Sequence, residues 1–141
     1  MAEGIFAALA EDQGLDVTSE SAGVRALKGE PAAPHASAVI EEMGMEIRGH
    51  RARQVSREML QRADLTLTMT PLHRDLLVRE FDTSKEEIYT LPEFTRNDPI
   101  TGIADPYGHA ITAYRVTARE LLRYIELVLA RLKKEMQSEA G

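Results

Sequence analysis

Apolar residues at the start of the chain repeat at the spacing of an amphipathic helix. Ala2, Ile5, Phe6 and Leu9 fall on one helical face. No Ser, Thr, Asp or Asn precedes them, so no side chain of the usual kind is available to accept hydrogen bonds from the first amides. The pattern therefore predicts an uncapped helix that begins with the chain and stops at Gly14.

Strand patterns alternate with further helix patterns. Short stretches at 16–22, 63–70 and 86–91 contain β-branched and alternating apolar residues and are predicted to be strands. Three helices are predicted between 35 and 81. The first carries Ala36, Val39, Ile40 and Met43 and stops at Gly44, a short one begins at a Ser56 cap, and the third follows Thr70-Pro71 and carries Leu72, Leu76 and Leu77. Turns are expected over 92–108, which is rich in Pro, Asp and Gly.

The longest helix pattern lies near the end of the chain. Its apolar residues keep i, i+3, i+4 spacing, and they are Tyr114, Ala118, Leu121, Leu122, Ile125, Val128, Leu129 and Leu132. A helix with such a stripe is expected to pack on a sheet. The alternation of strands and helices predicts an α/β fold with a mostly parallel sheet, and ligands of such folds lie beyond the carboxyl ends of the strands.

Composition limits the possible partners and surroundings. A chain of 141 residues with 43% apolar content fits a single domain over 1–141. Its net charge of −6 disfavours nucleic acid and anionic membranes as partners. There is no apolar run of the ~20 residues that span a bilayer, and Glu3 and Glu11 stand where a secretory signal would carry basic residues. We therefore expect a cytoplasmic protein.

The sequence contains no pattern typical of a metal site or a nucleotide site. The chain contains no cysteine, and His35, His50, His73 and His109 have no metal-binding spacing between them. The arginines of 48–57 lack interleaved aromatic residues and are interpreted as a solvated face. Neither G-x-G-x-x-G nor G-K-[ST] occurs. We expect no metal and no cofactor.

The stretch Asp105-Pro106-Tyr107-Gly108 allows two interpretations. Asp, Pro and Gly at these positions are typical of a type I turn, and a near copy begins at Asp98. Alternatively, Pro106 forces Asp105 into an extended conformation that directs its carboxyl outward beside an aromatic ring, where it could protonate a leaving group. Of the two aspartates, Asp105 is the better candidate because it has the aromatic neighbour and lies nearer the last helix.

Four segments in one order carry a resemblance to a known family. They are "MAEGIF" at 1–6, "SAG" at 21–23, "HRARQ" at 50–54 and "DPYG" at 105–108, with "ADLTLTMT" at 63–70 before the last. Together they resemble the low-molecular-weight protein tyrosine phosphatases, including the bacterial protein arginine phosphatases. The resemblance implies a three-layer, doubly wound parallel sheet of four strands, in which "MAEGIF" directly follows a phosphate-binding loop that begins with cysteine and ends with arginine.

By that resemblance the first central strand and the whole loop are absent from this sequence. We therefore expect a truncated record, whose start lies at an internal methionine of a longer protein. A family member hydrolyses phosphotyrosine or phosphoarginine in proteins through a cysteinyl-phosphate. The 141-residue chain, which has neither the nucleophile nor the loop arginine, is expected to be inactive.

The resemblance also assigns residues that remain. Asp105 is the implied general acid and then base, and Tyr107 and Leu27 are the implied substrate contacts. Ser21 and His50 are expected to hydrogen-bond the loop and hold its geometry.

Two other functions remain open at this point. An arsenate reductase shares the fold but needs further cysteines downstream, and this chain has none. A non-catalytic relative could instead bind a partner that adds a strand to the vacant place in the sheet.

Overall fold

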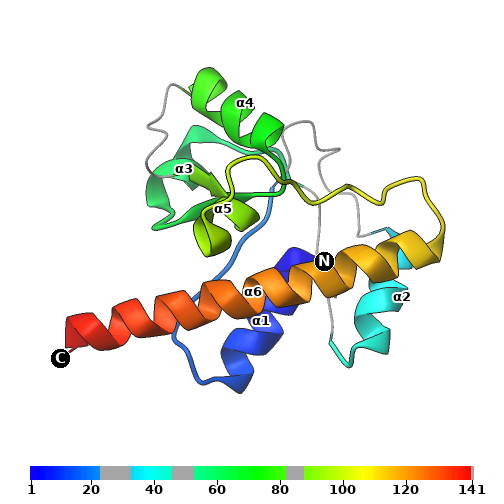
Figure 1. Cartoon of the computed structure of the whole chain (residues 1–141), viewed down its shortest axis with the longest axis horizontal. Coiled ribbons are helices and arrows are strands. Elements are labelled where there is room, and N and C mark those ends of the chain that lie inside the picture. The colour runs from blue at the N-terminus through cyan, green and yellow to red at the C-terminus, as the bar shows by residue number, and fades with distance from the viewer. Residues whose placement is uncertain (23–32, 46–52, 82–87, 141) are drawn as a thin grey trace. The chain divides into compact units, whose positions relative to one another are not determined.

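The computed structural model describes residues 1–22, 33–45, 53–81 and 88–140 (Figure 1). In chain order the elements are α1 (Ala2–Asp12), α2 (Pro34–Glu42), α3 (Arg57–Arg62), β1 (Thr66–Thr68), α4 (Pro71–Phe81), β2 (Ile88–Thr90), α5 (Leu91–Arg96) and α6 (Ile111–Ala140). The chain divides into a helical unit of residues 1–21, 31–50 and 105–141 and a sheet unit of residues 22–30 and 51–104. That both belong to one domain stays a prediction.

In the helical unit, α1 and α2 pack against the long helix α6 (Figure 1). The predicted apolar stripe of α6 is buried, because Ala118, Leu121, Ile125, Val128 and Leu129 are all at most 3% exposed. This stripe is therefore confirmed as core. No helix in the described part of the chain combines the length and apolar content that a bilayer crossing needs.

Glycine ends α1 where the sequence predicts. Gly14 adopts a left-handed conformation with φ of 66°, and the following amide, of Leu15, donates to the Ala10 carbonyl at 3.0 Å. Glycine reaches this conformation without the steric cost of a Cβ atom, so the last carbonyls of the helix are satisfied. Gly44 ends α2 in the same way.

The sheet unit contains two parallel strands covered by helices. β1 pairs with β2 in the register Leu67 to Tyr89. Ile88 packs against Leu77 of α4, whereas the ring of Tyr89 contacts Phe94 of α5, with centroids 5.6 Å apart. Successive strand residues point to opposite faces, so α4 and α5 lie on different faces of the sheet. Parallel strands between helical layers are the predicted α/β arrangement.

The predicted strand at 16–22 is wrong. Residues 15–22 form neither helix nor strand, although Val17 and Thr18 favour extended structure. A strand exists only where a neighbour accepts and donates its backbone hydrogen bonds, and the described sheet contains β1 and β2 alone. The other two predicted strands are confirmed but shorter than expected. Of the three leucines on the helix predicted after Pro71, Leu77 is buried, whereas Leu72 is 64% exposed.

α5 lies inside the stretch that the sequence analysis assigned to turns. The Thr90 hydroxyl accepts a hydrogen bond from the Glu93 amide at 3.0 Å, and Glu93 Oε1 accepts one from the Thr90 amide at 3.2 Å. This reciprocal pair is a capping box, and it starts a helix despite the turn-rich composition. Arg74 of α4 donates to the same Glu93 oxygen at 3.0 Å, so one carboxylate joins two helices.

Replacing the cap should destabilise the protein measurably. Thr90→Val keeps the side-chain shape but leaves a buried amide without its acceptor, so we expect a loss of about 1–2 kcal/mol in the free energy of unfolding. Thr95→Val is the matched control, because the Thr95 hydroxyl only donates a second bond to the Leu91 carbonyl within the helix. Urea denaturation measures both variants. Equal losses would mean that the cap has no special role.

Candidate functional site

The amino-terminal end of α1 is an electropositive helix terminus. Met1 occupies the cap position and makes no side-chain capping bond, as predicted. The first amides of any helix lack intrahelical acceptors, and the helix dipole adds partial positive charge there. Burial lowers the pKa of the Met1 amino group, while the nearby Glu3 carboxylate raises it. This end of α1 is therefore partly removed from water and suited to holding an anion.

A shared apolar cluster fixes this helix end relative to the start of α6. Met1 and Ile111, the first residue of α6, both pack on the cluster. Its buried members come from α2 and α6 and are Ala36, Val39, Tyr114 and Ala118. Arg115 of α6 also makes a two-pronged ion pair with Glu42 of α2, at 3.0 and 2.9 Å. The turn that leads into α6 and the amino-terminal end of α1 therefore contact the same apolar cluster.

That turn contains Asp105, the predicted acid. Asp105 Oδ1 accepts a hydrogen bond from the Tyr107 amide at 3.0 Å, and the His109 amide donates to the Pro106 carbonyl at 2.9 Å. Gly108 completes the turn with φ of 81°, a conformation that favours glycine. Asp105 is exposed and Tyr107 is 76% exposed. The two interpretations of this stretch are thus compatible, because the residues form a turn and the turn leaves the carboxyl in solvent.

Asp98, in the near copy, lies in a different environment. Its Oδ1 accepts from the amides of Ile100 and Thr101, at 3.0 Å each. Hydrogen bonds from the Thr101 side chain, the Thr101 amide and the Ile100 amide, in that order, lower the pKa of Asp98. These bonds stabilise the carboxylate form, so Asp98 is a poor proton donor near neutral pH.

Ser21 is bound to α1. Its hydroxyl donates to Glu3 Oε2 at 2.7 Å, which ties the end of segment 15–22 to the first turn of α1. Glu3 is not among the predicted site residues, although an acidic residue in the first turn of a helix is a recognisable signal. The other two predicted site residues, Leu27 and His50, lie outside the described residues.

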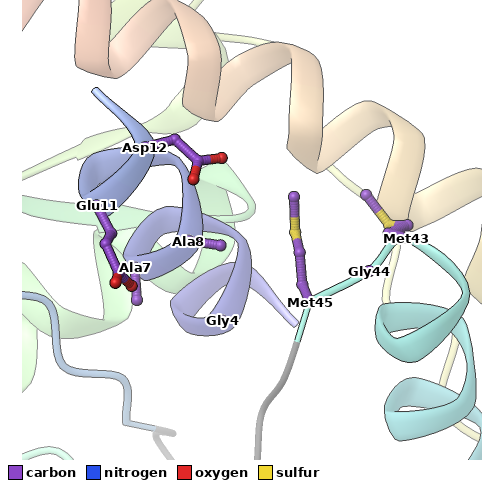
Figure 2. A pocket seen from close by; sticks show the side chains of 8 residues that line it. All are labelled: Gly4, Ala7, Ala8, Glu11, Asp12, Met43, Gly44 and Met45. Atoms are coloured by element: carbon purple, nitrogen blue, oxygen red, sulfur yellow. The ribbon is translucent and has the colours of Figure 1, made fainter. Parts of the chain in front are cut away.

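A pocket of about 420 Å³ lies elsewhere in the helical unit, between α1 and the segment after α2 (Figure 2). It is lined by small, acidic and methionine residues, namely Gly4, Ala7, Ala8, Glu11, Asp12, Met43, Gly44 and Met45. Two carboxylates on its wall repel a phosphate group, so we do not assign phosphate chemistry to it. Across the four described ranges, no three His, Cys, Asp or Glu side chains are grouped to hold a metal ion.

Comparison with known proteins decides the family. The sequence pattern of the family described as "Low molecular weight phosphotyrosine protein phosphatase" matches residues 1–138, nearly the whole chain. The chain belongs to this family.

Relatives of the low-molecular-weight phosphatase family agree in sequence and in structure. A protein-arginine-phosphatase from Bacillus subtilis is 32% identical over 96% of this chain and 89% of its own. A solved structure of YwlE arginine phosphatase, a cysteine-to-serine variant with a phosphorylated active-site serine, has a TM-score of 0.91 at 31% identity, covering 96% of this chain and 88% of its own. A low-molecular-weight protein tyrosine phosphatase from T. tengcongensis has a TM-score of 0.86 at 37% identity, with 92% and 88% covered.

Family membership confirms the expected fold class and the expected enzyme class. The solved relatives share the α/β fold, and the family consists of protein-tyrosine and protein-arginine phosphatases, which act on phosphorylated proteins. Arsenate reductase, one of the two alternatives, is disfavoured by these matches. The sequence of this family member contains no cysteine.

Proposed function

We propose that this protein is the scaffold and general acid of a phosphatase that removes phosphate from arginine or tyrosine side chains of proteins. In the proposed reaction a cysteine thiolate attacks phosphorus, and the bond from phosphorus to the substrate oxygen or nitrogen breaks. Asp105 gives its proton to that leaving atom. The Asp105 carboxylate then takes a proton from water, whose oxygen attacks phosphorus and releases inorganic phosphate and the thiolate.

One observation carries the assignment of Asp105. Its turn is anchored, through Ile111, to the same cluster as Met1 at the anion-suited end of α1. The Tyr107 amide donates a hydrogen bond to Asp105 Oδ1, and Asp105 Oδ2 has no partner among the residues that the structure describes. A carboxyl held at one oxygen with the other open to solvent can carry a proton to and from a bound substrate. Asp98, whose Oδ1 already serves two amides, is the weaker candidate.

The remaining residues receive supporting roles in the proposal. Tyr107, with its exposed ring, lines the substrate cleft. Ser21 acts through Glu3, which it holds by a hydrogen bond at the first turn of α1. Leu27 as a substrate contact and His50 as a support of the phosphate loop are proposed on the family resemblance alone.

In this proposal the nucleophile comes from residues outside this sequence, since none of the 141 is cysteine. The YwlE relative with a phosphorylated active-site serine in place of cysteine supports a phosphorylated enzyme intermediate in this family. The 141-residue polypeptide by itself is therefore proposed to be inactive. We also propose that the protein is located in the cytoplasm.

The test is a gain of function. The amino-terminal segment of the Bacillus subtilis relative, with its active-site cysteine, is fused directly ahead of Met1 to give a chimera. We expect the chimera to hydrolyse an aryl phosphate and a phosphoarginine or phosphotyrosine peptide, whereas the 141-residue polypeptide and a chimera with cysteine changed to alanine do neither. Turnover by the polypeptide of verified mass would overturn the proposal, as would a folded chimera without activity.

The same chimera tests substrate preference. The relatives named arginine phosphatases match almost the whole chain, and a tyrosine phosphatase matches nearly as much of it. Matched peptides that differ only in phosphoarginine or phosphotyrosine, compared by kcat/KM, measure which transition state the scaffold stabilises.

A further inference from the structure

Two large apolar residues are exposed in the part of the sheet unit that the structure describes. Leu72 is 64% exposed and Ile100 is 85% exposed. A single exposed apolar residue is common on protein surfaces and needs no function, whereas apolar residues gathered beside a ligand site mark a binding surface. These two belong to different segments, the first turn of α4 and the stretch between α5 and α6. Their meaning therefore depends on whether those segments meet.

The two segments touch at Thr70 and Gly102. A Cβ atom on Gly102 would lie 3.1 Å from Thr70 Cγ2, closer than such atoms normally pack, so the absence of a side chain permits this approach. Leu72 lies two residues beyond Thr70, and Ile100 lies two residues before Gly102. Both exposed side chains are thus attached beside one point of contact between the segments.

That point lies at the carboxyl end of β1. Met69 directly follows the strand, and its carbonyl accepts a hydrogen bond from the Ile103 amide at 2.8 Å. Ligands of parallel α/β folds bind beyond the carboxyl ends of the strands. The proposed acid Asp105 also follows Ile100 by five residues, a span of at most about 18 Å of extended chain. Leu72 and Ile100 therefore border the edge of the sheet where a substrate is expected.

Charged groups near these two residues are already engaged within the protein. Arg74 donates to Asp75 Oδ1 at 3.1 Å and to Glu93 Oε1 at 3.0 Å. Asp98 Oδ1 accepts hydrogen bonds from two backbone amides, at 3.0 Å each. Because a paired charge gains little from a further partner in water, a charged ligand group has little to gain here. An apolar group gains more, since contact with Leu72 removes apolar surface from water.

We propose that Leu72 and Ile100 form a contact surface for an apolar residue of the substrate polypeptide, within about five residues of the phosphorylated side chain. This inference rests on the proposed function, and the occupant is a protein because the family acts on phosphorylated proteins. Leu72 and Ile100 determine specificity in this proposal. They contact the polypeptide beside the phosphorylated residue and touch neither the phosphate nor the reacting atoms.

The test measures peptide binding to the chimera with its active-site cysteine changed to serine, so that no turnover is needed. A parent peptide contains one phosphorylated residue among serines and glycines, and it is made with phosphotyrosine and with phosphoarginine. Further peptides carry a single leucine at one of five positions on either side. Fluorescence anisotropy gives Kd for each. We expect leucine at one or two neighbouring positions to tighten binding by about three- to tenfold, the gain from partly burying one apolar side chain.

Substitutions in the protein locate the contact. Leu72→Ser and Ile100→Ser should each remove most of the gain from leucine and leave Kd for the parent peptide within about twofold. Leu127→Ser makes the same chemical change at an exposed leucine of α6, and it should keep the gain. Circular dichroism checks that each variant is folded. None of the three substitutions should alter hydrolysis of a small aryl phosphate by the cysteine-containing chimera, because that substrate has no flanking residues.

Three results would overturn this proposal. They are equal binding of the parent and all leucine peptides, a gain from leucine that survives both Leu72→Ser and Ile100→Ser, and an equal loss of the gain in Leu127→Ser. Failure of the cysteine-containing chimera to hydrolyse the aryl phosphate would instead reject the proposed function. The binding comparison does not depend on turnover, so it would still decide whether Leu72 and Ile100 contact an apolar residue.

Discussion

Asp105→Asn in the cysteine-containing chimera is expected to lower kcat by about 10²–10⁴-fold, the usual contribution of a positioned general acid. The substitution is conservative for the turn, because an amide oxygen can still accept the hydrogen bond that Asp105 Oδ1 takes from the Tyr107 amide. Only the transferable proton is lost. The loss should therefore appear in kcat with little change in thermal stability.

Asp98→Asn is the matched control for this prediction. It preserves the acceptor for the Ile100 and Thr101 amides in the same manner, and it should leave kcat within about twofold of the unsubstituted chimera, since surface changes have small effects. For Asp105→Asn, the loss in kcat should be larger with a phosphotyrosine peptide than with an aryl phosphate whose phenol is acidic. An acidic phenol leaves as the phenolate and needs no proton from Asp105. Equal losses for the two aspartates would contradict the assignment.

Leu129→Ala is expected to destabilise the protein by about 2–5 kcal/mol, the range for a fully buried leucine. Leu129 is 0% exposed on α6, the helix against which α1 and α2 pack. Its loss removes apolar contacts and leaves a cavity that the rigid helix can close only in part. Because whole domains have about 5–15 kcal/mol of stability, this one change could unfold a large fraction of the molecules.

Leu127→Ala, two residues earlier on the same helix, is the control. Leu127 is 39% exposed, so the same chemical change should cost less than about 1 kcal/mol. Urea denaturation of both variants, with the slope m checked for constancy, gives the comparison. If Leu127→Ala costs as much as Leu129→Ala, the apolar stripe of α6 is not the buried surface that the structure describes.

The candidate site was predictable in part. The turn at Asp105 follows from local chemistry, because Asp, Pro and Gly fix the backbone within a few residues. Neighbours in sequence distinguish Asp105 from Asp98, and the structure adds a separate reason, the hydrogen bonds from Thr101 and Ile100 that lower the pKa of Asp98. The bond from Ser21 to Glu3 joins residues 18 apart. No local pattern indicates such a partner.

Helix stops and caps were also local enough to predict. Gly14 and the Ser56 cap are confirmed, since each depends on hydrogen bonds within a single turn of helix. The capping box of α5 was present in the sequence as Thr90 and Glu93, but the surrounding Pro and Asp residues favoured a turn assignment. Here a reciprocal pair of side-chain hydrogen bonds outweighed the composition of the stretch.

The sequence by itself determined which segments other than α5 become helices, where most of them stop, which face of α6 is apolar, and that no thiol chemistry is available within these residues. These features depend on contacts between near neighbours in the chain. Tertiary structure alone decided that only residues 66–68 of the predicted strand at 63–70 pair, that 16–22 forms no strand, and that the start of α6 and the amino-terminal end of α1 share one cluster. Strands and clusters require partners far away in sequence, and only the folded chain determines which partners are present.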